Sequence, residues 1–71
     1  MIKAGIIGGA GYTAGELLRI LLHHPNAEIR FVQSTSNAGN LISDVHIDLL
    51  GESDLTFTSE MPFDKVDVIF L

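Results

Sequence analysis

A glycine-rich turn between an apolar segment and an amphipathic segment constrains the fold more than any other feature of this sequence. The turn occupies residues 8–15 and reads GGAGYTAG. Residues 2–7, before the turn, mix apolar and small side chains without helical spacing, which is typical of a short strand covered on both faces. After the turn, apolar residues recur three or four positions apart, as on one face of a helix. The pattern predicts a strand, a tight turn and a helix.

The helix is predicted to begin near Ala14 and to end by His24. Its inward-facing positions are Ala14, Leu17, Leu18, Leu21 and Leu22. Thr13, followed three residues later by Glu16, fits a capping box at the helix start. Pro25 prevents the helix from continuing much beyond His24. The terminal histidines, at positions 23 and 24, are expected to cap free carbonyl groups at the negative end of the helix dipole.

The rest of the chain predicts an α/β fold. A strand is expected at 28–34, parallel to the first, a short helix on the spacing of Ile42, Val45 and Leu49, a brief exposed strand at 55–58 and a buried strand at 66–71. We interpret this order as the N-terminal part of a Rossmann-type doubly wound parallel sheet. Since a parallel sheet carries its chemistry in the loops after its strands, the 71 residues are expected to be an incomplete domain.

The glycine turn has the features of a dinucleotide-phosphate site. Gly8 would permit a tight turn, Gly11 would let the backbone approach a pyrophosphate, and Ala14 or Gly15 would allow close packing of helix and strand. Free N–H groups near Gly11 to Thr13 would face the phosphates, aided by the helix dipole. The predicted phosphate-binding residues are Gly8, Gly9, Ala10, Gly11, Tyr12 and Thr13. Alternatively, the glycines only make a tight connection, as in some flavodoxin-like proteins.

The end of the second predicted strand bears on the choice of cofactor. An acidic residue at this place binds the ribose 2′-hydroxyl of NAD, but here the sequence is Ser34-Thr35-Ser36. Hydroxyl and N–H groups without a carboxylate would tolerate a 2′-phosphate, which favours NADP. Glu28 is rejected as the ribose ligand because it begins the strand. The alternative is an ordinary polar loop.

Two segments resemble the N-acetyl-gamma-glutamyl-phosphate reductase family. Residues 8–17 (GGAGYTAGEL) match its turn, GxSGYTGxEL, with Ala10 and Ala14 in place of a serine and a glycine. Residues 38–49 match its second signature, AGxxxSDxHPxL, except that Ile47 stands where proline is usual. Asn40 replaces a frequent lysine, which removes a cation near the proposed cofactor loop.

The resemblance implies the NADPH-dependent reduction of N-acetyl-gamma-glutamyl phosphate to its semialdehyde, in arginine biosynthesis. It further implies a thioacyl-enzyme formed on a cysteine and assisted by a histidine. Cysteine is absent from the 71 residues, so both groups are expected beyond Leu71 and this part alone is expected to be inactive. An aspartate-semialdehyde dehydrogenase-like reductase and a non-catalytic dinucleotide-binding module are the alternatives.

Composition limits the partners. The net charge is −5 and the four basic residues are scattered, so no positive stripe is available for nucleic acid. Neither a signal peptide nor the ~18 apolar residues of a membrane span is present, which favours the cytoplasm. The resemblance implies a small acyl phosphate as the substrate and a homo-oligomeric full-length enzyme.

The remaining polar residues give weaker signals. His46 with Asp44 and Asp48 is a poor metal site on a short helix, and no metal is expected. His46 could orient the loop beside a substrate or simply pack against a helix, and it is not assigned a catalytic role. Asp54, Glu60, Asp64 and Asp67 show no paired spacing for acid–base chemistry and are expected to be solvated.

Overall fold

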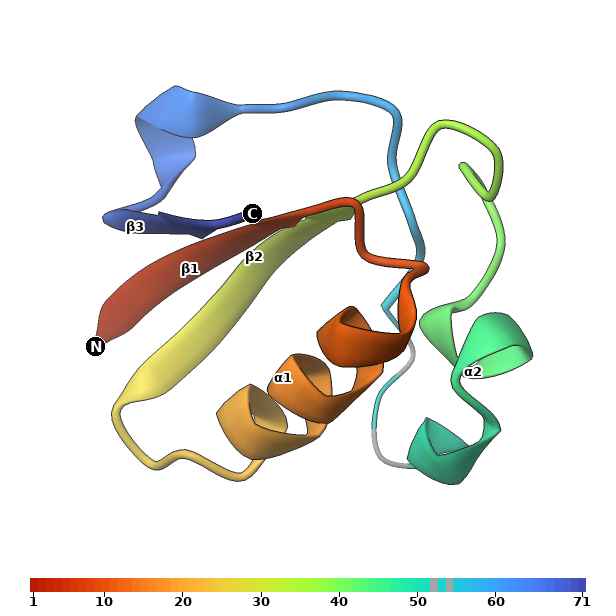
Figure 1. Cartoon of the computed structure of the whole chain (residues 1–71). Coiled ribbons are helices and arrows are strands. Elements are labelled where there is room, and N and C mark those ends of the chain that lie inside the picture. Colours follow the sequence, from red (N-terminus) through yellow and green to blue (C-terminus); the bar gives the residue numbers. More distant parts are fainter. Residues whose placement is uncertain (52, 54) are drawn as a thin grey trace.

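The computed structural model describes residues 1–51, 53 and 55–71. A parallel sheet is formed by β1 (Ile2–Ile7), β2 (Ala27–Gln33) and β3 (Val68–Phe70), in the order β2-β1-β3. The helical elements are α1 (Tyr12–Leu22), α2 (Ile42–Val45) and the 3-10 turns η1 (Ile47–Leu49) and η2 (Phe63–Lys65). Figure 1 shows α1 beneath the sheet and α2 beside α1. The predicted Rossmann-type α/β class is confirmed.

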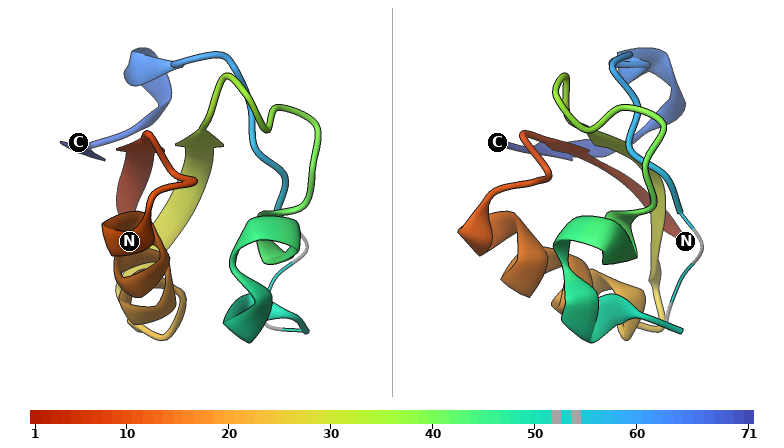
Figure 2. Two further views of the ribbon diagram at one scale, coloured as in Figure 1. Left: turned by 45° about the vertical axis from the view of Figure 1, so that its right-hand side comes forward. Right: turned by 90° about the vertical axis from the view of Figure 1, so that its right-hand side faces the viewer.

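The central position of β1 makes its carboxyl end a topological switch point. The chain leaves β1 to form β2 on one side, and β3 later pairs on the other side. The left view of Figure 2 shows β2 and the C-terminal strand on opposite sides of β1. A backbone pair joins Lys3 to the segment before β3, since Asp67 N–H donates to Lys3 O at 2.7 Å. Ligands of open α/β sheets bind in the crevice at such a point.

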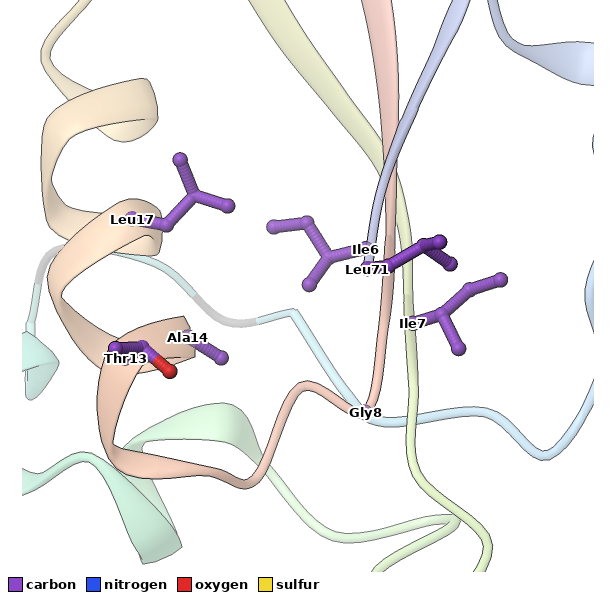
Figure 3. Close-up of a pocket in the computed structure, with 7 residues that line it drawn as sticks. All are labelled: Ile6, Ile7, Gly8, Thr13, Ala14, Leu17 and Leu71. Carbon is purple, nitrogen blue, oxygen red and sulfur yellow. The ribbon is translucent and has the colours of Figure 1, made fainter.

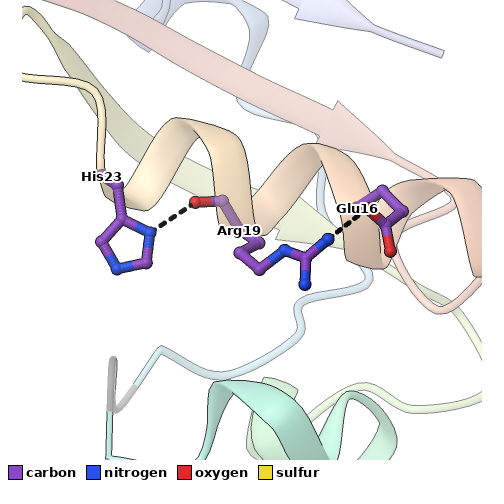
Figure 4. A network of polar contacts seen from close by, with 3 residues as sticks. All are labelled: Glu16, Arg19 and His23. Carbon is purple, nitrogen blue, oxygen red and sulfur yellow. Dashed lines mark hydrogen bonds and ion pairs between the residues drawn. The ribbon is translucent and has the colours of Figure 1, made fainter.

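Helix α1 begins earlier than predicted, at Tyr12, with Gly11 as its N-cap. The expected capping box is therefore wrong: Thr13 lies inside the first turn, and no side chain caps the helix. Glu16 instead forms an ion pair with Arg19, one turn along the exposed face (Figure 4). Gly11 has the extended backbone angles of an N-cap residue, with φ −74° and ψ 164°, and the helix begins at the residue that follows it.

The end of α1 follows the prediction more closely. His23 Nδ1 lies 2.9 Å from the carbonyl oxygen of Arg19, where a protonated Nδ1 donates to it (Figure 4). The ring thus satisfies a carbonyl of the last turn, as expected. His24 Nδ1 accepts from Asn26 N–H at 3.1 Å, so this second ring stabilises the turn into β2 and does not cap the helix.

Strand β2 contains an irregularity that separates its apolar side chains. The residue before Gly5 pairs with Ile29, and Gly5 pairs with Phe31, so Arg30 is skipped and points to solvent. Val32 and Ile29 therefore both pack in the core with α1, although they are three residues apart. Phe31 instead covers Gly5, where a Cβ atom would lie 2.3 Å from Phe31 Cε2.

The core lies between the sheet, α1 and the segment that follows β2. Its buried members are Ala4, Ile6, Leu18, Leu21, Val32, Ile42, Leu49 and Phe57. The short helix predicted on Ile42, Val45 and Leu49 is divided into α2 and η1 by His46. Ile42 and Leu49 are buried, but Val45 is exposed.

Two predictions for the C-terminal third are wrong in part. Residues 55–58 form isolated bridges and no strand, and Phe57 is buried in the core. The strand expected to be buried at 66–71 is limited to β3, and its residues are exposed to half-buried. Asp54 lies outside the described residues, whereas Glu60, Asp64 and Asp67 are exposed as predicted. No helix of the described part is long and apolar enough to cross a membrane.

Candidate functional site

Hydrogen bonds from β2 fix the first part of the glycine turn. Gly8 has a φ of +73°, a conformation that glycine adopts without strain, so its predicted role in a tight turn is confirmed. Its N–H donates to Gln33 Oε1 at 3.0 Å, and Gly9 N–H donates to Gln33 O at 2.7 Å. Gly11 N–H donates back to Gly8 O at 3.3 Å. The turn is thus bound to the end of the neighbouring strand.

Gly9 is the buried anchor of the turn. A Cβ atom here would lie 2.1 Å from Val32 Cγ1, so only glycine lets the turn pack against β2. The carbonyl oxygen of Gly9 lies 2.7 Å from His46 Nε2 in a buried contact. Since its N–H is also bonded, both backbone polar groups of Gly9 are satisfied inside the protein.

Gly15 serves a different contact from the predicted one. We expected Ala14 or Gly15 to allow close packing of helix and strand. A Cβ atom at Gly15 would instead lie 2.7 Å from His46 Nδ1, so its missing side chain makes room for that ring. Gly9 provides a close approach to the sheet, because a Cβ atom there would meet the side chain of Val32.

The N-terminus of α1 offers N–H groups to a ligand. An α-helix leaves its first N–H groups without intrahelical partners, and the Gly11 N-cap provides no side chain to satisfy them. Gly11, Tyr12 and Thr13 are exposed, and the first turn carries no acidic residue. The positive end of the helix dipole is therefore accessible to an anion.

A pocket opens between this helix start and the switch point. It has a volume of about 310 Å³ and is lined by Ile6, Ile7, Gly8, Thr13, Ala14, Leu17 and Leu71. Figure 3 shows the three helix residues on one side and the strand residues on the other. The lining combines apolar side chains with the backbone of Gly8, a suitable surface for a cofactor that has a polar phosphate bridge and flat rings.

The second predicted part of the site lies at the end of β2. Ser34 is buried; its N–H donates to Thr58 O at 2.9 Å, and its Oγ accepts from Asn37 Nδ2 at 3.4 Å. Thr35 and Ser36 are exposed. Ser34 thus stabilises the loop from inside, and the side chains of Thr35 and Ser36 are accessible to a ligand.

The acidic residue of β2, Glu28, lies far from this loop. Glu28 pairs with Lys3 at the beginning of the sheet, whereas Gln33 pairs with Ile7 at its end. The carboxylate of Glu28 forms an ion pair with Arg30, and the hydrogen bond from this guanidinium lowers the pKa of Glu28. This position agrees with the prediction that Glu28 is not the ribose ligand.

Sequence reasoning missed Gln33 and did not assign His46 to the turn. Each lies far along the chain from the glycine that it contacts, 25 residues for Gln33 and 37 for His46. The signal for Gln33 was its place directly after the apolar residues Phe31 and Val32, where a buried amide needs partners. For His46 the signal was an imidazole between apolar residues of a short helix.

The described residues contain no group of three His, Asp or Glu side chains close enough to hold a metal ion. Asp44 is directed to the start of α2, where its Oδ2 accepts from Leu41 N–H at 3.2 Å. His46 faces Gly9. The side chain of Asp48 lies outside what the structure describes.

Comparison with known proteins places these features in a family. The family described as "Semialdehyde dehydrogenase, NAD binding domain" matches residues 3–71. The chain is 69% identical over 70 residues to an N-acetyl-gamma-glutamyl-phosphate reductase of Bacteroides fragilis, 66% identical over 70 residues to one of Phocaeicola vulgatus and 55% identical over 71 residues to one of Flavobacterium johnsoniae.

These alignments cover 99%, 99% and 100% of the chain but 22% of each relative, so the chain spans about a fifth of their length. The resemblance found in the two sequence motifs therefore extends over nearly all of the 71 residues. The chain belongs to the family of semialdehyde dehydrogenase NAD-binding domains.

Proposed function

We propose that this chain binds the pyrophosphate of NADP(H) at the glycine turn and forms the N-terminal part of an N-acetyl-gamma-glutamyl-phosphate reductase. The observation that carries the proposal is the uncapped N-terminus of α1 at the switch point of the sheet. Its first N–H groups are positioned to receive an anion, as in other dinucleotide folds. The similarity to reductases of this name supports the same proposal.

The residues of the turn would divide the binding between them. Tyr12 and Thr13 would contact the phosphates through N–H groups at the helix start. Gly8, Gly9, Ala10 and Gly11, whose own N–H is bonded to Gly8 O, would shape the turn beneath them. Thr35 and Ser36 would contact the 2′-phosphate, on the loop that Ser34 holds in place. The bound nicotinamide would supply hydride for reduction of the acyl phosphate to the semialdehyde.

Other groups of the reaction belong to the remainder of the proposed enzyme. Formation of a thioester requires a cysteine, and the 71 residues contain none. We therefore propose that residues 1–71 are part of the NADP-binding domain and that a catalytic and dimerisation domain completes the protein. A homo-oligomeric enzyme in the cytoplasm is part of this proposal.

Cofactor binding to the full-length protein tests the proposal. We expect NADPH to bind more tightly than NADH in calorimetric titrations. Ser36→Asp places a carboxylate beside the proposed 2′-phosphate and should weaken NADPH binding by about tenfold or more, because like charges in contact cost several kcal/mol. Affinity for NADH should change little.

Asn26→Asp is the matched control, since it adds the same charge in the turn before β2, at the opposite end of the strand. An equal loss of NADPH affinity in both variants would refute the assignment of the loop. The rates of reduction of N-acetyl-gamma-glutamyl phosphate and of aspartyl phosphate decide between the proposed reductase and an aspartate-semialdehyde dehydrogenase-like enzyme. Activity with neither substrate would favour a non-catalytic binding module.

A further inference from the structure

His46 occupies a buried position directly behind the glycine turn. It lies in the break between α2 and η1, it is 8% exposed, and its Nε2 is 2.7 Å from Gly9 O. Because a carbonyl oxygen can only accept, Nε2 carries a proton and donates it to this bond. The ring also lies against Phe57, with 6.3 Å between ring centroids.

The surroundings of His46 hold its ring in one place. Its own N–H donates to Ile42 O at 2.9 Å, and its carbonyl accepts from Leu49 N–H at 2.9 Å. On the other side, α1 has a glycine where a Cβ atom would lie 2.7 Å from Nδ1 and 3.0 Å from Cε1 of the ring. Backbone bonds fix the loop, and Gly15 leaves space for the imidazole.

The contact acts on a residue that does not face the ligand. Gly9 is buried, and its N–H is held by Gln33 O. Without His46, the Gly9 carbonyl would lose its partner and the turn would be fixed from the β2 side only. A turn with more conformations must be ordered when a ligand binds, and this cost lowers the apparent affinity.

We propose that His46 is a positioning residue for the phosphate-binding turn: its Nε2–H bond to Gly9 O holds the turn in the conformation that receives the pyrophosphate. This inference rests on the proposed function of the turn. His46 contacts no phosphate itself, and its effect passes through Gly9. The ligand affected is any dinucleotide that places a pyrophosphate at the start of α1.

The test compares two substitutions of His46 in the full-length protein. His46→Phe keeps a ring but removes the donor, and His46→Gln retains an N–H donor at a similar reach. We expect His46→Phe to weaken NADPH binding by about tenfold, the value of one buried hydrogen bond. His46→Gln should restore the affinity to within about threefold of the wild type, by the same conversion.

A second ligand separates positioning of the turn from general damage. Adenosine 2′-monophosphate has the 2′-phosphate but no pyrophosphate, so its affinity should be the same in the wild type and in both variants. Leu49→Ala is the matched control, because it removes a core side chain from the same segment and leaves the Gly9 contact in place. At a similar loss of thermal stability, it should retain NADPH affinity.

Three results would overturn the inference. These are unchanged NADPH affinity in His46→Phe, failure of His46→Gln to restore it, and an equal loss of affinity in Leu49→Ala. If His46→Phe does not fold, Gly15→Ala tests the same contact by displacing the ring, and unchanged NADPH affinity in that variant would count equally against it. Absence of NADPH binding in the wild type would instead refute the proposed function of the turn.

Discussion

Substitution of Gly9 by alanine provides the sharpest test of how the turn packs. The added Cβ atom would lie 2.1 Å from Val32 Cγ1, whereas carbon atoms in contact are about 3.5–4.0 Å apart. The turn and β2 would have to separate by more than an ångström. Val32 is fully buried and cannot move toward solvent. Overpacking of this kind costs about 1–3 kcal/mol in the free energy of unfolding.

A double-mutant cycle isolates this contact. Val32→Ala removes both γ carbons and should cost about 2 kcal/mol by itself, as for other buried truncations. With the γ carbons gone, the alanine at position 9 has space. Independent effects would give a loss of about 4 kcal/mol for the double variant, but we expect about 2 kcal/mol, a coupling typical of residues in direct contact.

Urea unfolding of the full-length protein, followed by circular dichroism, measures each free energy. Gly11→Ala is the matched control, because its Cβ would lie 3.7 Å from the nearest atom, Gly8 O, and its φ of −74° suits alanine. This control should change stability by less than about 1 kcal/mol, because alanine is a poorer N-cap than glycine but restricts the unfolded chain. Additive losses for Gly9→Ala and Val32→Ala, within about 0.5 kcal/mol, would refute the packing argument.

Two further predictions concern polar contacts of the sheet. Gln33→Leu removes the acceptor of the Gly8 N–H and should lower the free energy of unfolding by about 1 kcal/mol, as measured by urea unfolding. It should also weaken NADPH binding, as measured by calorimetric titration. Arg30→Gln should raise the pKa of Glu28 toward its ordinary value, as followed by NMR, because the guanidinium that lowers it is lost. A lowered pKa stabilises the fold above the pKa of the unfolded chain, so this small contribution disappears as the pH falls through the folded value. In Arg30→Gln the part of it that comes from the guanidinium should be lost.

Local patterns in the sequence predicted the elements that local chemistry determines. Strand β1 was predicted at its observed bounds, and the helical spacing identified the buried face of α1 through Leu18 and Leu21. The start of the helix was misplaced because Thr13 and Glu16 imitate a capping box. In the structure, the conformation of Gly11 decides where the helix begins.

Contacts between distant segments account for what could not be predicted. The burial of Phe57 depends on its place beside β2, which no nearby residue reveals. Gln33 and His46 acquire their roles only when β2 and the α2 segment lie against the turn. The glycines indicated a phosphate site, but the residues that stabilise it are set by tertiary structure.

The bonds to Gly8 and Gly9 have a consequence for folding. They join the turn to positions 25 and 37 residues further along the chain. Contacts of such long sequence separation require closure of large loops and therefore form late compared with the helix that follows the turn. During synthesis the glycine turn leaves the ribosome first, but it cannot reach its final shape until His46 has also emerged. Cofactor binding at the proposed site would therefore report that the chain from β1 to η1 has folded.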